Sequence, residues 1–255
     1  MKKLGLTVAE ILITTTIVGL ISAITIPTLV NNSQQKVLVN SLPVMITNIE
    51  KTLQNIMLKE NVTDLSETEL WKNYGKRLSS SHTNDTVLKS FSHDIGIFNK
   101  AVGGNVKSYY NGKMYTINNT LNNIMTKYTY TPFEFKNGSV VFINGRQDPT
   151  INEDRALENG LYYTKHIAQI IIDVNGKQKP NTIGRDIFYF YLNEKGKLVA
   201  YGSYEFALAS ILSAQDGDPN NYTNYYWTTN CSDTEKGDGS YCTGRLVEND
   251  FKMDY

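Results

Sequence analysis

From Ile11 to Val30, near its start, the chain has twenty positions without a charged side chain. At about 1.5 Å of rise per residue, a helix of this length crosses a hydrocarbon core of roughly 30 Å. From Asn31 on, apolar residues recur at spacings of three and four, which is typical of a helix that buries one face against a sheet. The pattern predicts one long helix that ends near Asn61. The apolar positions of its second half are Leu42, Met45, Ile49, Leu53, Ile56 and Met57.

The segment after the long helix is less regular. Asp64 and Ser66 offer caps for a short helix over Glu67–Tyr74. Residues Lys76–Asp85 contain three consecutive serines and few apolar side chains, so they are interpreted as a surface loop. Within Val87–Val102, the positions expected to be buried are Leu88, Phe91, Ile95, Ile97 and Phe98.

Strand-like runs come next, rich in β-branched and aromatic residues. Asn137-Gly138 joins two of them at a spacing suited to a tight hairpin, and Glu194–Gly196 makes another turn. Because short turns join consecutive strands, we expect an antiparallel sheet and, with the long helix, an α+β fold. The predicted strands cover Lys113–Ile117, Phe133–Phe135, Ser139–Asn144, His166–Asp173, Asp186–Leu192 and Lys197–Tyr204.

Composition and charge narrow the class of protein. The 255 residues carry 25 Lys and Arg against 25 Asp and Glu, so the formal net charge is zero. Without an excess of positive charge, no nucleic acid partner is expected. The residues after the membrane stretch are numerous enough for one sizeable domain with its own core.

Catalytic chemistry leaves no signature in the sequence. The histidines His82, His93 and His166 are scattered, and no His-x-x-x-His or Cys-x-x-Cys spacing, nucleophile elbow or phosphate-binding loop occurs. We expect no enzyme, and a membrane-tethered hydrolase has no constellation to support it. A group of aromatics offers either a stacking surface for sugars or bases or, as in strands generally, cover for the sheet. These are Tyr189, Tyr191, Tyr201, Tyr204, Tyr222, Tyr225, Tyr226 and Trp227.

The first ten residues carry the most specific signal. Lys2 and Lys3 precede Gly5, and Glu10 stands one position before the uncharged stretch. A secretory signal peptide carries no acid at the head of its apolar region and ends it with a small-residue cleavage site, which Ala23-Ile24-Thr25 matches poorly. The order of basic leader, glycine, acid and uncharged stretch instead resembles the class III signal of type IV pilins and type II secretion pseudopilins.

The resemblance implies that a prepilin peptidase cuts between Gly5 and Leu6 and that Leu6 is N-methylated; Leu6 stands where most members of the family carry Phe. Glu10 becomes the fifth residue of the mature chain and the assembly residue. An ionised carboxylate at the edge of a membrane costs several kcal/mol unless it is paired, and the partner in this family is the free amine of a neighbouring subunit. Such a head-to-tail contact does not close, so it yields a filament. The alternative is that Glu10 sits in the headgroup region of a lone anchor.

The resemblance also implies a pilin-like fold, in which the second half of the helix packs on an antiparallel sheet. Pro27 lies where the family commonly has a helix-kinking proline, and Pro27 and Pro43 each lack a backbone donor, so we expect a bend at both. Lys2 and Lys3 on the cytoplasmic side give a single-pass protein of the bacterial inner membrane. The implied segments are a leader at 1–5, a transmembrane half-helix at 6–30, an amphipathic half-helix at 31–60 and an extracytoplasmic domain at 61–255.

The stretch DVNGKQKPNTIGRDIFYF, residues 173–190, resembles a recurring element of pilin-like proteins. Asp173, Asn175 and Asp186 offer hard oxygen ligands for Ca²⁺, and the major pseudopilins hold calcium in a loop beside their sheet. The spacing is not that of an EF-hand. We favour the alternative, in which Asp173 and Asn175 close a turn through side-chain to backbone hydrogen bonds and the glycines take positive φ. A second acidic cluster, interpreted as a solvated loop, consists of Asp216, Asp218 and Asn220.

Cys231 and Cys242 are an even pair with ten residues between them, in a chain whose first helix places the downstream residues outside the cytoplasm. Disulfides persist in such compartments, so a bridge is predicted, with two free buried thiols as the alternative. Closing a ring of this size stabilises by about 3 kcal/mol in the chain-entropy model. Many type IV pilins also carry a disulfide-bounded loop in this region.

The function expected from these features is structural. The chain would be a subunit of a type IV pilus or type II secretion pseudopilus, with prepilin peptidase, other pilin or pseudopilin subunits and an inner-membrane assembly platform as partners. A globular part larger than that of many major pilins favours a minor or specialised subunit. The alternative is a pilin-anchored surface-binding module whose domain holds a glycan, DNA or a host protein.

Overall fold

The computed structural model describes residues 7–79, 85–102, 104–121, 130–145, 165–206, 227–232 and 237–255. Contacts divide the chain into two compact units, Met1–Val37 and Leu38–Tyr255. Several sequence predictions lie outside the described residues. They concern Gly5, Leu6, His82, the acidic cluster Asp216, Asp218 and Asn220, and the tyrosines Tyr222, Tyr225 and Tyr226.

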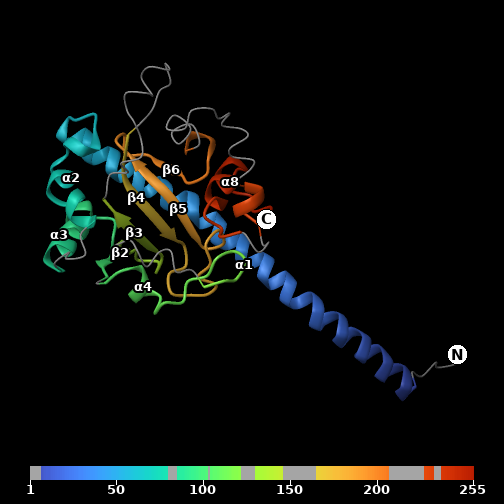
Figure 1. Ribbon diagram of the computed structural model, residues 1–255. Helices are drawn as coiled ribbons and strands as arrows, with labels where there is room; N and C mark the ends of the chain where they lie inside the picture. Colours follow the sequence, from blue (N-terminus) through green and yellow to red (C-terminus); the bar gives the residue numbers. More distant parts are fainter. Residues whose placement is uncertain are drawn as a thin grey trace, which may run out of the picture. The chain divides into compact units, whose positions relative to one another are not determined.

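The predicted long helix is confirmed as α1, which runs from Val8 to Glu60 (Figure 1). Asn61 ends it in the left-handed conformation at φ 54°, and the Val62 N–H donates to the Met57 carbonyl at 3.0 Å. This is the usual way in which a helix satisfies its last carbonyl groups. The helical backbone continues through Pro27 and Pro43, so the bends expected there stay a prediction.

The second half of α1 buries one apolar stripe against the sheet. Ile56, expected on this stripe, is partly buried, whereas Val44 and Leu58 point to solvent with 60% and 76% of their surface exposed. Burial therefore follows the helical period of the apolar residues in the sequence. The fully buried residues of the stripe are Val39, Leu42, Met45, Ile49, Leu53 and Met57.

Short helices come after α1. Asp64 caps the 3-10 helix η1, Leu65–Glu67, and Thr68 rather than Ser66 caps α2, Glu69–Tyr74, by accepting from the Trp71 N–H. The loop predicted over Lys76–Asp85 is wrong at its start, because Gly75–Ser79 form a second 3-10 helix, η2. Its Leu78 is fully buried, and this single apolar side chain fixes the turn in the core.

Helix α3, Asp85–Ile95, contributes Phe91 to an aromatic cluster in the same core. Phe91 lies 5.1 Å from Phe133, and Phe98 stacks on Phe133 at 4.9 Å between ring centroids. Leu88, Phe91, Ile95 and Phe98 are buried as predicted, and Ile97 is partly buried.

The antiparallel sheet is confirmed. Its six strands lie in chain order, so each pairs with the strand next in sequence (Figure 1). Only the first strand, which is two residues long, was not predicted. The strands are β1 Lys100–Ala101, β2 Thr131–Glu134, β3 Val140–Asn144, β4 His166–Asp173, β5 Ile187–Asn193 and β6 Leu198–Ala200.

Both predicted hairpin turns are present. In the β2–β3 turn, Gly138 has φ 85° and the Asn137 side chain accepts from the Ser139 N–H at 3.1 Å. In the β5–β6 turn, Gly196 has φ 71° and the Asn193 side chain accepts from two backbone N–H groups, at 3.0 and 2.9 Å. An amide side chain before a left-handed glycine sets each turn.

Two strand predictions need correction. Lys113–Ile117 is not a strand, because Asn111 and Gly112 before it have positive φ. Within this segment only Tyr115 forms isolated bridges, one to Leu121 and one to Thr182 of the β4–β5 loop. The strand predicted over Lys197–Tyr204 is shorter, Leu198–Ala200. The Tyr201 N–H still donates to the Tyr189 carbonyl at 2.9 Å, and Gly202 then turns the chain at φ 83°.

The face of the sheet away from α1 carries a second core. Helix α4, Val106–Tyr109, and the following Tyr110 pack there on Phe142 and Ile171. Near β6, the rings of Tyr191, Phe206 and Tyr241 form a third cluster. The last helix, α8, spans Cys242–Glu248. Both faces of the central strands are therefore buried, and the β4–β5 loop joins two of these strands.

Candidate functional site

The start of α1 is a reciprocal cap made by Thr7 and Glu10. The Thr7 N–H and hydroxyl both donate to the Glu10 carboxylate at 2.8 Å, and the Glu10 N–H donates back to the Thr7 hydroxyl at 3.3 Å. This capping box satisfies amides that the helix leaves without partners. Glu10 therefore has a role within its own chain that the sequence interpretation missed, although Thr-x-x-Glu is its usual signal.

Residues Val8–Thr25 form the one described helix that is long and apolar enough to cross a membrane, and none of them is buried. Glu10 is the only ionisable residue among them. The hydroxyls of Thr14, Thr15 and Thr16 donate to carbonyls three or four residues earlier at 2.7 to 3.1 Å. Since these hydroxyls are satisfied within the helix, they need no water.

Asp173, at the end of β4, closes the first turn of the β4–β5 loop. Its Oδ1 accepts from the N–H groups of Asn175 and Gly176 at 3.1 and 2.8 Å, and its Oδ2 accepts from the Tyr110 hydroxyl at 2.5 Å. Asp173 is fully buried, and Gly176 takes φ 63°. No sequence pattern pointed to Tyr110, which lies 63 positions away.

Asp186 closes the other end of the loop. Its two carboxylate oxygens accept from the backbone N–H groups of Asn181 and Thr182, at 2.8 and 2.6 Å. Gly184 turns the chain at φ 82°. A methyl group there would lie 2.8 Å from the sulfur of Cys242, so this position has no room for a larger residue.

Burial raises the pKa of both carboxyl groups. Burial, followed by the charge of Asp186, raises the pKa of Asp173 well above its ordinary value. Burial also raises the pKa of Asp186 to about 6, although the N–H groups of Thr182 and Asn181 oppose this. For Tyr110, burial and then the negative charge of Asp173 raise the pKa of the phenol. The loop thus holds two buried acids whose full ionisation is costly.

The fit of Asp173, Asn175 and Asp186 to calcium is mixed. The donor atoms suit Ca²⁺, and the buried side-chain oxygen of Asn175 has no hydrogen-bond partner in the described part of the chain. Each of the four carboxylate oxygens, however, already accepts a protein hydrogen bond. No group of three or more His, Cys, Asp and Glu suited to a metal gathers among the described residues. The geometry therefore favours a hydrogen-bonded turn, and calcium stays a prediction.

Among the described residues of the aromatic group, the rings near β6 pack on one another and Tyr204 is 42% exposed. Tyr191 is 8% exposed and stacks against His166 at 4.8 Å and against Phe206 at 5.5 Å. Tyr201 lies between Phe206 and Tyr241, at 4.5 and 4.8 Å. These rings pack on one another, as expected for residues that cover a sheet.

The predicted bridge between Cys231 and Cys242 is present, and the structure has no free thiol. It ties the segment before Gly237 to the first residue of α8. Both cysteines are fully buried and pack against Ile117.

The chain is thus an α+β protein with an apolar N-terminal helix, a six-stranded antiparallel sheet and one disulfide. No protein-family model matches its sequence, and no curated protein or solved structure is significantly similar to it.

Proposed function

We propose that the chain is a structural subunit of a type IV pilus or type II secretion pseudopilus, in a minor or specialised position. A prepilin peptidase cuts it between Gly5 and Leu6 and methylates Leu6. Its helix then joins a bundle of like helices in the inner membrane. Other subunits and an assembly platform are its partners.

The layout of the chain supports this proposal. The apolar half of α1 has the length and composition of a membrane span, and the amphipathic half packs on an antiparallel sheet. A disulfide bounds the last part of the chain. This pilin-like combination fits a subunit that is held by a membrane helix and displays a folded domain.

The observation that carries the proposal is Glu10, the single ionisable residue of Val8–Thr25. Thr7 alone satisfies part of its hydrogen-bonding capacity, but no described positive group neutralises its charge. A carboxylate in this position calls for a counter-charge when the helix enters a bilayer. The amine freed at Leu6 of a neighbouring subunit is positively charged and would lie at a similar depth in the bilayer to Glu10.

The proposal is tested first by recovering the protein from membranes and determining its N-terminus and mass. We expect a terminus at Leu6 with one additional methyl group. An intact Met1, or a terminus after Ala23, would contradict the assignment.

Assembly is tested with two variants that separate charge from capping. Glu10→Gln keeps a side chain able to cap the helix and removes the charge, whereas Thr7→Ala breaks the cap and keeps the charge. We expect Glu10→Gln to abolish incorporation into filaments and Thr7→Ala to reduce it only slightly. Equal incorporation of wild type and Glu10→Gln would show that this charge does not drive assembly.

A further inference from the structure

The geometry points to a strap, Lys252–Tyr255, that seals the Cys231–Cys242 disulfide against reduction by dithiols. The bridge exchanges with a dithiol reductant only when the strap lifts. With the strap docked, the Cys231–Cys242 disulfide resists reduction; with the strap open, it can exchange with a dithiol. The strap acts independently of filament assembly.

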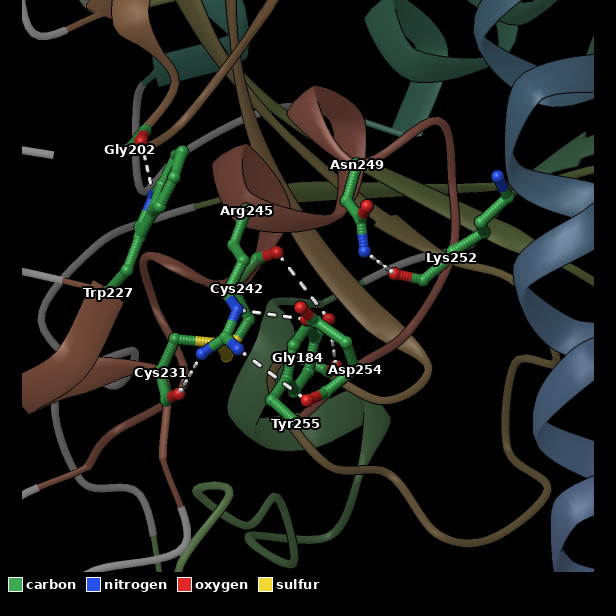
Figure 2. Close-up of polar contacts among 10 residues, drawn as sticks. All are labelled: Gly184, Gly202, Trp227, Cys231, Cys242, Arg245, Asn249, Lys252, Asp254 and Tyr255. Atoms are coloured by element: carbon green, nitrogen blue, oxygen red, sulfur yellow. Dashed lines mark hydrogen bonds and ion pairs between the residues drawn. A yellow bond between two sulfur atoms is a disulfide. The ribbon is translucent and has the colours of Figure 1, made fainter. Parts of the chain in front are cut away.

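The strap returns to the disulfide because the chain reverses after α8. Asp250 and Phe251 both have positive φ, at 50° and 58°. The Asn249 side chain fixes the turn by donating to the Lys252 carbonyl at 2.9 Å (Figure 2). Beyond it, Met253 and Tyr255 turn toward the core while Lys252 and Asp254 face solvent, which is the alternation of an extended segment.

Arg245 of α8 clamps the strap. Its Nε pairs with the Asp254 carboxylate at 2.9 Å, one Nη donates to the Asp254 carbonyl at 3.5 Å, and its guanidinium lies 5.5 Å from the centre of the Tyr255 ring (Figure 2). The other Nη donates to the Cys231 carbonyl at 3.4 Å. One side chain thus joins the strap to the bridge.

Tyr255 is the residue of the strap that contacts the disulfide cluster. Its ring packs against the cluster of Ile117, Cys231 and Cys242. Its hydroxyl donates to the Gly184 carbonyl at 2.9 Å and lies 3.4 Å from the Cys242 carbonyl (Figure 2). Among the described contacts, the one backbone–backbone hydrogen bond of the strap is that of the Lys252 N–H to the Asn249 carbonyl at 2.9 Å, within the turn. Side chains hold residues 253–255, which can therefore open without unfolding the sheet.

Sealing matters because reduction requires direct attack on sulfur. A thiolate of the reductant attacks one Sγ, the Cys231–Cys242 bond breaks and the other cysteine leaves as a thiolate. The second thiolate of the reductant then attacks the mixed disulfide. Two electrons pass to the protein, which gains two thiols after proton uptake, and the reductant ends as a cyclic disulfide. Both cysteines are fully buried with the strap docked, so the first attack is blocked.

The test is the rate of reduction of the oxidised full chain in detergent by excess dithiothreitol. Free thiols are trapped by alkylation and counted by mass. We expect Tyr255→Ala and Arg245→Gln to raise the rate constant by about tenfold or more, and Tyr255→Phe, which keeps the ring, to raise it by about threefold. Lys252→Ala, in the same segment but facing solvent, is the matched control and should stay within about twofold of wild type.

The urea dependence of the rate separates strap opening from unfolding. Opening of a short segment exposes little surface, so we expect the rates of wild type and Tyr255→Phe to change little with urea below the unfolding transition. Equal rates in wild type, Arg245→Gln and Tyr255→Ala would overturn the proposal. So would rates that rise with urea as steeply as global unfolding does.

Discussion

The two halves of α1 share one backbone but differ in what surrounds their side chains. From Val8 to Thr25 no residue is buried, and apolar side chains cover the helix on all sides. From Leu38 to Glu60 only one stripe is apolar, and it is buried to 8% exposure or less. Uniform apolarity suits a lipid environment, whereas a stripe suits packing on a sheet. The two halves of one helix thus suit different surroundings, lipid for the first and protein for the second. A substitution can therefore disrupt one half without the other.

The largest expected effect is on the striped half. Leu42→Ala removes a fully buried side chain from the core and should lower the free energy of unfolding by about 3–5 kcal/mol. Val44→Ala, two positions on and 60% exposed, is the matched control and should change it by less than about 0.5 kcal/mol. Chemical denaturation in detergent measures both. Equal losses would mean that the stripe does not carry the packing.

The uniformly apolar half should respond to charge and leave the domain unaffected. Val18→Arg places a charge in the middle of the predicted span, where insertion costs about 2.5–3.5 kcal/mol. We expect a smaller membrane-integrated fraction on carbonate extraction and an unchanged free energy of unfolding. The same substitution at Val44 should leave membrane integration intact. A lower free energy of unfolding of the domain in Val18→Arg would contradict the independence of the two halves.

The pH dependence of the free energy of unfolding should arise from the domain alone and not from the uniformly apolar half of α1. Because the folded pKa of Asp186 is raised from 3.8 to about 6, the folded state binds more protons than the unfolded state between these values. Stability from this group is therefore present below about pH 4 and is lost as pH rises to about 6, by about 2–3 kcal/mol. Asp186→Asn should remove this contribution, so denaturation curves should decline less steeply across the window, and the decline that remains belongs to Asp173, whose pKa is also raised. Val18→Arg should leave the decline unchanged.

Calcium distinguishes the two interpretations of the same loop. Because every carboxylate oxygen of Asp173 and Asp186 already accepts a protein hydrogen bond, we expect millimolar Ca²⁺ to leave Tm unchanged at neutral pH. A rise in Tm that disappears in Asp186→Asn would instead assign Asp173, Asn175 and Asp186 as ligands.

The smallest effect expected of a substitution concerns the contact between the striped half of α1 and the edge strand β6. One Glu50 oxygen accepts from the Leu198 N–H at 2.8 Å, and the other pairs with Lys197 at 3.1 Å. Glu50→Gln retains an acceptor and loses the ion pair, so it should cost about 0.5–1 kcal/mol, less at high salt. A matched change at the exposed Lys100–Glu134 pair should cost no more.

Much of the fold could be predicted because local patterns coincide with it. The spacing of Leu42, Met45 and Ile49 indicated the buried face of α1, and Asn137-Gly138 indicated a hairpin. Lys113–Ile117 failed because its composition suits a strand, while the left-handed Asn111 and Gly112 before it turn the chain out of the sheet. Strand β1 was missed, since two residues carry no alternation.

The candidate sites were predictable only where partners are close in sequence. The turn at Asp173 was foreseen from Asn175 and Gly176, which lie directly after it. Tyr110 and Arg245 were not, because their contacts with Asp173 and with the disulfide depend on tertiary packing. Composition alone does not indicate which of seventeen tyrosines meets a buried acid.

The order of the strands has a consequence for synthesis. Since β1 to β6 lie side by side in the order in which they are translated, each new strand finds its neighbour already in place. The sheet can thus grow from one edge as the chain emerges, with few distant pairings to wait for. The contact of Glu50 with Leu198 joins a residue translated early to one in β6, the last strand to be translated. It can therefore form only after the rest of the sheet has been translated.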